Sequence, residues 1–143
     1  MTDVISVAKK CLQDEAEALL NLIPNIDENF TKAIELIYES KGKLIVTGVG
    51  KSGHIGAKIA STLASTGTPA FFVNPLDAFH GDLGMFSEGD VVLAISNSGQ
   101  TDELLRFIPL LAERNIPIVS MSGNPKSLLA EYSHCHLNIS VAR

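Results

Sequence analysis

The stretch Val91-Val92-Leu93-Ala94-Ile95-Ser96-Asn97-Ser98-Gly99-Gln100-Thr101 decides the fold, because it joins an apolar run to a loop of hydroxyl and amide side chains. A continuous apolar run bounded by turn residues predicts a strand buried on both faces, as in a parallel sheet. The amphipathic pattern that opens near Thr101 predicts a helix. We therefore expect a strand, a polar loop and a helix in direct succession.

The expected helix start also makes this loop a candidate anion site. The first backbone N–H groups of a helix have no partner within it, and the helix dipole is positive at that end. Ser96, Ser98 and Thr101 add hydroxyl donors without charge, which suits the phosphate ester of a small molecule. The alternative is an ordinary connection in which Thr101 only caps the helix.

Similar short apolar runs recur from Lys43 onward and alternate with helical patterns. This alternation predicts an α/β fold, a three-layer sandwich with a doubly wound parallel sheet of five strands in the order 2-1-3-4-5. The expected strands are 44–47, 70–73, 91–95, 118–121 and 136–141, and the expected helices are 53–66, 76–80, 101–114 and 125–132.

Two helices are expected before this core, separated by Pro24-Asn25. Cys11 falls on the apolar side of the first helix, and we interpret it as a small core residue. Phe30 and Ile34 share one face of the second helix, which Asp27 can cap.

We expect one domain over residues 1–143, with N-terminal helices in 1–40 and an α/β core in 41–143. The fifth apolar run ends almost at Arg143, so little sequence remains to cover that edge of the sheet. Either the first helices and a neighbouring subunit supply the cover, or the chain is shortened and its core is incomplete.

Composition and charge exclude several classes of protein. The net charge is −5 and no basic stripe is visible, which argues against a nucleic-acid partner. No secretory signal is present and no apolar run approaches the roughly 18 residues of a membrane span, so no membrane partner is expected. Cys11 and Cys135 show no disulfide or metal spacing, so we expect a reduced, cytoplasmic protein.

A second loop, Gly48-Val49-Gly50-Lys51-Ser52-Gly53, lies between the first expected strand and the next helix. Its GxGxxG pattern is the dinucleotide fingerprint, but the second strand ends in Asn74, where an acidic residue would bind the ribose. A Walker A loop would need glycine at Ile45. We therefore expect no nucleotide cofactor, and a glycine turn that brings the backbone and Lys51 close to an anion.

Topology connects the two loops. Strands one and three are neighbours in this sheet order, and ligands bind beyond the carboxyl ends of the strands where the chain reverses direction. We therefore expect residues 48–53 and 96–101 to face each other across one pocket.

Two further side chains could carry chemistry. His80 lies in the long connection before the third strand, where Gly81 allows close approach and Asp82 could orient the imidazole, although a structural role is the simpler reading. Glu103 lies in the first turn of the helix after Thr101, where a carboxylate favours the helix dipole without any catalytic role. His134 and His136 lack further ligands nearby, so no metal is expected.

Four strings together resemble one family, and the resemblance runs from about residue 25 to the end. They are Gly48-Val49-Gly50-Lys51-Ser52-Gly53-His54-Ile55-Gly56, Ser65-Thr66-Gly67-Thr68-Pro69, His80-Gly81-Asp82-Leu83-Gly84-Met85 and Ile95-Ser96-Asn97-Ser98-Gly99. The chain is similar to the sugar isomerase (SIS) domains of arabinose-5-phosphate isomerases. These enzymes interconvert ribulose 5-phosphate and arabinose 5-phosphate for the synthesis of the acid sugar Kdo, found in bacterial surface polysaccharides such as lipopolysaccharide.

The resemblance implies a homotetramer that acts on a sugar phosphate through an enediol(ate), without a redox cofactor. It implies three active-site residues: Glu103 as base, Lys51 as the charge that stabilises the oxyanion, and His80 as an aid to proton transfer. Glu103 and His80 could exchange these roles. The residues implied to line the sugar-phosphate pocket are Gly50, Ser52, Ser96, Asn97, Ser98 and Thr101.

Two features favour a second reading of the same resemblance. Family members usually have an acidic residue in place of Gln100, and longer members continue into a segment with a further active-site histidine and often into CBS domains. The alternative function is therefore a non-catalytic SIS module that binds a sugar phosphate or a nucleotide sugar.

Overall fold

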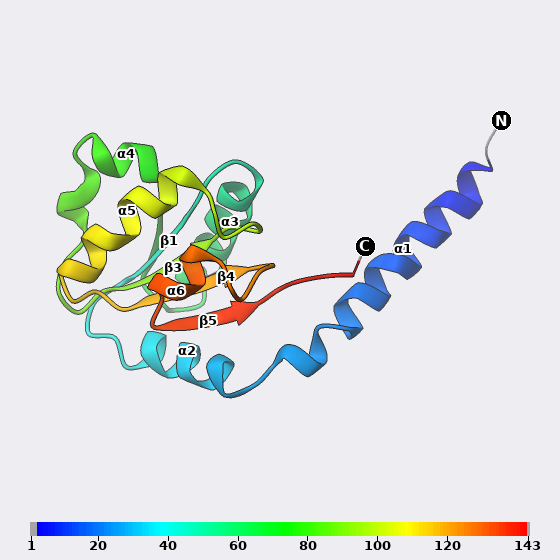
Figure 1. Ribbon diagram of the computed structural model, residues 1–143, viewed down its shortest axis with the longest axis horizontal. Coiled ribbons are helices and arrows are strands. Elements are labelled where there is room, and N and C mark those ends of the chain that lie inside the picture. Colours follow the sequence, from blue (N-terminus) through cyan, green and yellow to red (C-terminus); the bar gives the residue numbers. More distant parts are fainter. Residues whose placement is uncertain (1–2, 143) are drawn as a thin grey trace.

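The computed structural model describes residues 3–142 and contains one five-stranded parallel sheet (Figure 1). The strand order is β2-β1-β3-β4-β5, which confirms the predicted α/β fold and its order. The strands are β1 (Leu44–Gly48), β2 (Ala70–Val73), β3 (Val91–Ile95), β4 (Ile118–Ser122) and β5 (Cys135–Asn138). The helices are α1 (Val4–Leu20), α2 (Glu28–Tyr38), α3 (Lys51–Ser65), α4 (Pro75–Phe79), α5 (Asp102–Glu113) and α6 (Leu128–Tyr132), with two short 3₁₀ turns at Ile23–Asn25 and Asp82–Met85.

Helices cover both faces of the sheet, which gives the expected three layers. Leu44 and Val46 of β1 belong to the apolar cluster under α2 and α3, whereas Ile45 belongs to the cluster under α4, α5 and α6. Figure 1 shows α2 and α5 on opposite sides of the strands. Because successive side chains of a strand point to opposite faces, burial of both faces requires the continuous apolar runs seen in the sequence.

Two glycines bring α3 close to β1. An added Cβ at Gly53 would lie 2.8 Å from the carbonyl oxygen of Gly48, and one at Gly56 would lie 3.1 Å from Cγ1 of Val46. The backbone of α3 therefore rests almost directly on the strand. This contact sets the direction in which α3 leaves the loop at Gly50.

The N-terminal helices correct one expectation. No residue of α1 is buried among residues 3–142, and Cys11 is exposed rather than part of the core. In α2 only Ala33 is buried, while Phe30 and Ile34 are 41% and 51% exposed. The apolar stripes predicted both helices correctly, but they do not indicate which surface covers the apolar side chains. In Figure 1, α1 extends away from the sheet.

The edge strand β5 is partly covered by α2. The thiol of Cys135 donates a hydrogen bond to the carbonyl of Asn29 at 2.8 Å, and the ammonium group of Lys32 donates to the carbonyl of His134 at 2.8 Å. Of the two early helices, α2 thus covers part of this strand, whereas α1 buries none of its residues.

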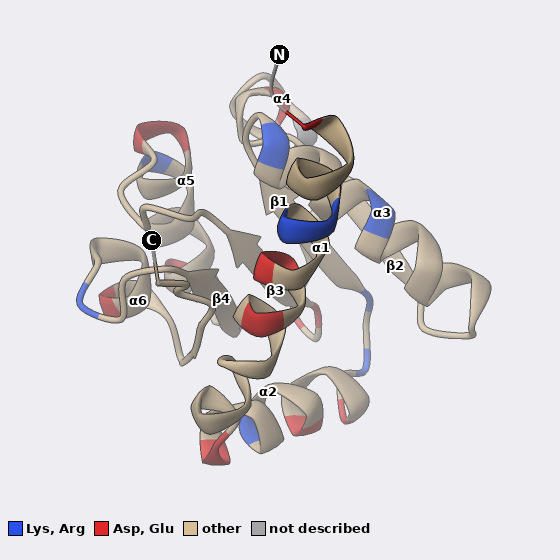
Figure 2. Ribbon diagram, turned by 90° about the vertical axis from the view of Figure 1, so that its right-hand side faces the viewer, with Lys and Arg blue, Asp and Glu red and all other residues tan. Residues whose placement is uncertain are grey.

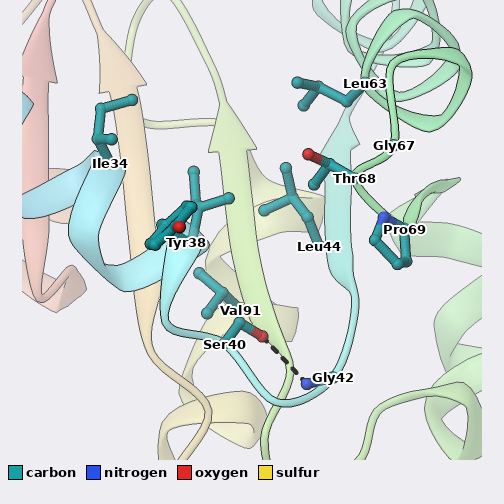
Figure 3. Close-up of a pocket in the computed structure, with 11 residues that line it drawn as sticks. Ile34, Tyr38, Ser40, Gly42, Leu44, Leu63, Gly67, Thr68, Pro69 and Val91 are labelled. Carbon is teal, nitrogen blue, oxygen red and sulfur yellow. Dashed lines mark hydrogen bonds between the residues drawn. The ribbon is translucent and has the colours of Figure 1, made fainter.

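An apolar groove of about 410 Å³ lies between α2 and the C-terminal end of α3 (Figure 3). Its lining includes Tyr38, Leu63 and Pro69, together with the first residues of β1 and β3, Leu44 and Val91. It therefore lies at the amino ends of the strands, opposite the edge at which the two polar loops emerge.

In the ribbon of Figure 2, positions of Lys and Arg are interspersed with positions of Asp and Glu. Within residues 3–142, no helix is long and apolar enough to cross a membrane.

Candidate active site

The two polar loops leave the same edge of the sheet side by side. Gly48, the last residue of β1, lies opposite Ile95, the last residue of β3, in a parallel register. The segments that follow these residues therefore start as neighbours. This is the point where the chain reverses direction in the sheet order, as the sequence predicted, and the position at which open α/β sheets bind ligands.

The loop after β3 is held in one conformation by its own side chains. Ser96 is only 2% exposed, and its hydroxyl oxygen accepts a hydrogen bond from the N–H of Gly99 at 3.0 Å. The same hydroxyl lies 2.7 Å from the hydroxyl of Thr101. Asn97 and Ser98, between these contacts, are exposed. The loop thus buries Ser96, leaves Thr101 half-buried and presents Asn97 and Ser98 to solvent.

Residues 123–129 contact this loop and bond its backbone. Gly99 has φ +66°, and an added Cβ there would collide with Oγ and Cβ of Ser127. The N–H of Gly123 donates to the carbonyl of Asn97 at 2.8 Å, and the N–H of Leu129 donates to the carbonyl of Gly99 at 3.1 Å. Gly99 is therefore required both for its conformation and for the space it leaves to Ser127.

The first turn of α5 is open to an anion. Thr101 occupies the N-cap position, but its side chain makes no capping bond to any described residue and instead contacts Ser96. Helix N–H groups without a side-chain acceptor are available to water or to a ligand. Glu103 lies half-buried in this first turn, beside an exposed ion pair of 3.0 Å between Asp102 and Arg106.

The glycine loop also ends at an uncapped helix. Gly50 has φ +62° and is the N-cap of α3, with no side-chain capping bond in the described part of the chain. Lys51 begins the helix and is exposed, and Ser52 is half-buried. A cavity of about 190 Å³ adjoins the loop, lined by Gly48, Gly50, Gly53, His54, Ala57, Phe72 and Asn74.

His80 follows the short helix α4 and is exposed. The helix packs against α5 through the rings of Phe79 and Phe107, whose centroids lie 6.4 Å apart at 68°. Because Glu103 lies in the first turn of α5, this contact brings the element that carries His80 to the element that carries Glu103. The side chain of Asp82, which the sequence suggested as a partner of His80, lies outside the described residues.

The three predicted catalytic side chains are not linked to one another by polar interactions among the described residues. Within residues 3–142, no hydrogen bond or ion pair joins any two of Lys51, His80 and Glu103. Each reaches solvent from a different element, α3, the end of α4 or α5. The chain alone therefore presents these groups around an open surface rather than in a closed pocket.

Three further residues lie close to the loop, although no local sequence pattern links them to it. Ser122 at the end of β4, Ser127 at the start of α6 and His136 on β5 form a polar cluster behind Gly99. His136 bonds Ser120 and Ser122, while Nδ1 of His134 accepts the N–H of Ile118 at 3.0 Å. No group of three or more candidate metal ligands occurs among the described residues.

Comparisons with known proteins agree with this geometry. Residues 36–143 match the SIS domain family. The arabinose 5-phosphate isomerase KdsD of Pseudomonas aeruginosa is 48% identical over 141 residues, which are 99% of this chain and 43% of that protein. The KdsD of Yersinia pestis is 51% identical over 139 residues, 97% of this chain and 42% of that protein. The chain thus spans less than half the length of these curated relatives.

Solved structures extend the agreement to three dimensions. An Escherichia coli CFT073 protein in complex with arabinose 5-phosphate superposes with a TM-score of 0.92 at 38% identity, over 99% of this chain and 77% of that chain. A putative phosphosugar isomerase involved in capsule formation from Bacteroides fragilis gives a TM-score of 0.90 at 41% identity, over 94% and 72%. The SIS family model matches three quarters of the chain, and the fold superposes on these solved structures. This protein therefore belongs to the SIS domain family.

Proposed function

We propose that this chain is the sugar-phosphate-binding domain of an arabinose-5-phosphate isomerase, which interconverts D-ribulose 5-phosphate and D-arabinose 5-phosphate in the cytoplasm. The observation that carries the proposal is the uncapped N-terminus of α5 beside the glycine loop, at the switch point of the sheet. The similarity to KdsD proteins over nearly the whole chain supports this substrate, and links the product to Kdo and lipopolysaccharide synthesis.

The phosphate group fits the N-terminus of α5. Asn97 and Ser98 are exposed beside it and can donate hydrogen bonds, while Ser96 and Thr101 hold the loop through their paired hydroxyls. The dipole of α5 favours the phosphate charge without a counter-ion. Across the crevice, Gly50 and Ser52 take the sugar end of the ligand.

The isomerisation moves one proton between carbon atoms and one between oxygen atoms. Glu103 takes the proton from C1 of the ketose and returns it to C2, through an enediolate. Lys51 stabilises the negative charge that develops on O2. His80 helps the hydroxyl proton to pass from O1 to O2, and the reverse assignment of Glu103 and His80 balances equally. No step needs an oxidant, a metal or a cofactor.

The proposal also includes association of several copies of the chain. Val4, Leu12 and Leu19 of α1 are 69%, 69% and 68% exposed, although most of the stability of a protein helix comes from packing its apolar face. Packing against other copies of the chain would bury this stripe. We propose a homo-oligomer, a tetramer by resemblance, in which subunit contacts also close the open surface around Lys51 and His80.

The alternative is an SIS module that binds a sugar phosphate or a nucleotide sugar without turning it over. Such a module would also be compatible with the described residues, in which no hydrogen bond or ion pair joins Lys51, His80 and Glu103. Binding is common to both proposals, and only proton transfer separates them.

Proton transfer is tested by incubating ribulose 5-phosphate with the protein in deuterated water and following deuterium incorporation and arabinose 5-phosphate formation by NMR. We expect Glu103→Ala and His80→Ala to reduce turnover about 100-fold or more. Asp102→Asn, next to Glu103 but ion-paired on the surface, should stay near the wild-type rate.

Calorimetric titration with arabinose 5-phosphate accompanies the rate measurement. Binding without deuterium exchange would establish the binding module in place of the isomerase. Absence of both binding and exchange would refute the sugar-phosphate site, and turnover unaffected by either alanine variant would refute the residue assignment.

A further inference from the structure

A histidine and three serines form a hydrogen-bonded cluster behind the candidate phosphate loop. His136 lies on β5 opposite Ser120 of β4 in the parallel register. Its Nδ1 lies 2.8 Å from the hydroxyl of Ser120, and its Nε2 lies 3.2 Å from the hydroxyl of Ser122. Ser120, Ser122 and Ser127 are completely buried. Both ring nitrogens are therefore used, and the ring cannot turn without breaking a buried hydrogen bond.

The cluster continues from His136 to the loop. The hydroxyl of Ser122 lies 3.3 Å from that of Ser127, whose oxygen also accepts the N–H of Ala130 at 3.3 Å and so caps α6. Ser127 occupies the space that a side chain at Gly99 would need. The position of Ser127 thus limits the position of Gly99, and Ser122 limits the position of Ser127.

Serine hydroxyls alone do not fix this arrangement. Each can rotate, and Ser122 has competing partners, because its hydroxyl also donates to the carbonyl of Asn124 at 2.9 Å. The imidazole of His136 is a planar group that bonds Ser120 and Ser122 at a fixed separation. It is the one member of the cluster whose geometry is rigid.

The imidazole is suited to this role in its neutral form. Burial lowers the pKa of His136, and no carboxylate of the described residues bonds to the ring. The charged and titratable groups of the segments around it are Asp27, Glu28, Lys32, Glu35 and Tyr38 in residues 27–38, Lys126, Glu131 and Tyr132 in residues 126–132, and the neighbouring His134 and Cys135. A neutral imidazole donates through one nitrogen and accepts through the other, which matches two hydroxyl partners.

We propose that His136 is a positioning residue for the phosphate site, which acts through Ser122 and Ser127 to hold Gly99 and the loop 96–101 in their binding conformation. The proposal rests on the proposed function for the identity of the ligand, but not for the connection itself. His136 touches no ligand. It sets where Asn97, Ser98 and the first N–H groups of α5 lie when the phosphate arrives.

Three substitutions separate hydrogen bonding from ring packing. His136→Gln can still place an amide N–H where Nε2 contacts Ser122. His136→Asn reaches only as far as Nδ1 and Ser120. His136→Phe keeps the ring volume and loses both bonds. His134→Phe is the matched control, because His134 is also on this edge and also accepts one hydrogen bond, from Ile118, without contact to the cluster.

The first measurement is the dissociation constant for arabinose 5-phosphate and for inorganic phosphate. We expect His136→Phe and His136→Asn to weaken both about 10-fold, which is about 1.4 kcal/mol. His136→Gln should stay within about 3-fold of wild type, a difference below about 0.7 kcal/mol, and His134→Phe should not differ. If turnover is present, KM should rise more than kcat falls, because the loss is in binding rather than in the proton-transfer groups.

The second measurement is the backbone amide resonance of Gly99 in each variant without ligand. We expect it to move in His136→Phe and His136→Asn and to return close to its wild-type position in His136→Gln. This readout does not depend on activity, so it tests the connection even if the wild-type protein neither binds nor turns over the sugar phosphate. Failure of the wild-type protein to bind would overturn the proposed function alone.

Two results would overturn the positioning role: a Gly99 resonance that stays in place in His136→Phe, or equal affinities for His136→Asn and His136→Gln. If His136→Phe does not fold, Ser122→Ala replaces it. That variant keeps the histidine and removes its link to Ser127, so it should show the same displacement of Gly99 and the same loss of phosphate affinity.

Discussion

Gly99→Ala tests whether the loop conformation is set by the contact with Ser127. The substitution adds one carbon atom to a backbone with φ +66°, at a point where that atom would collide with Oγ and Cβ of Ser127. Two separate penalties therefore follow. One is the strain of a positive φ in a residue with a side chain, and the other is the displacement of a fully buried neighbour.

The two penalties can be estimated from the structure. A left-handed conformation costs a non-glycine residue about 1–2 kcal/mol. Displacing Ser127 adds about 1–3 kcal/mol for overpacking, and weakening the cap of α6, in which Ser127 accepts the N–H of Ala130, adds about 1 kcal/mol. We expect Gly99→Ala to lower the free energy of unfolding by about 3–6 kcal/mol.

Gly67→Ala is the matched control. Gly67 also has a positive φ, +102°, but no atom of the described residues lies within 4 Å of its added Cβ. It should lose only the strain, about 1–2 kcal/mol. In a Ser127→Gly background the collision is relieved, so the loss caused by Gly99→Ala should fall to the strain alone. The double-mutant cycle should therefore give a coupling energy of about 2–4 kcal/mol.

Urea unfolding of the wild type, the three single variants and the double variant, followed by circular dichroism, measures these differences. Equal losses for Gly99→Ala and Gly67→Ala, with no coupling to Ser127→Gly, would refute the reasoning. The loop would then be held by its own Ser96 and Thr101 hydroxyls rather than by Ser127.

Two further predictions concern buried polar groups. Thr47 is fully buried and its hydroxyl has no hydrogen-bond partner among residues 3–142. Thr47→Val should therefore raise the free energy of unfolding, measured in urea, by about 1 kcal/mol. A decrease in this free energy would show that the hydroxyl is bonded, for example to water. Burial alone would raise the pKa of Asp90, but hydrogen bonds from Lys43 and Ser87 outweigh it and hold the pKa below its usual value. The Asp90 carboxylate therefore binds a proton more readily in the unfolded chain than in the folded one. Its contribution to the stability of the fold is complete above about pH 4 and is lost as the pH falls through the folded-state pKa. Asp90→Asn should remove this acid-dependent part and cost about 3 kcal/mol at pH 7, and an unchanged pH dependence of urea unfolding would contradict the assignment.

Much of the fold could be predicted from patterns along the chain. The run Val91–Ile95 is buried on both faces as expected, and the paired ends Gly48 and Ile95 bring the two loops together as the sheet order requires. The amphipathic stripe of α1 was also recognised, but the core role of Cys11 was wrong. Periodicity identifies an apolar face without identifying its partner.

Of the candidate site, the loop and helix that are continuous in sequence could also be predicted. The sequence identified the loop 96–101 and its helix, because hydroxyl-rich residues before a helix are a local signal. It could not show that Ser96 and Thr101 bond each other, which leaves α5 without a side-chain cap. Whether Lys51, His80 and Glu103 act together stays a prediction, since no described contact joins them.

The sequence by itself determined the alternation of buried strands and helices, and the polar loop Ser96–Thr101, because both depend on neighbours along the chain. Only the tertiary structure decided what lies behind that loop. Ser122, Ser127 and His136 come from β4, from the N-cap of α6 and from β5, and they meet because parallel pairing places His136 opposite Ser120. Hydrogen bonds between distant segments have no periodicity in sequence. The support of Gly99 therefore becomes visible only when the sheet is assembled.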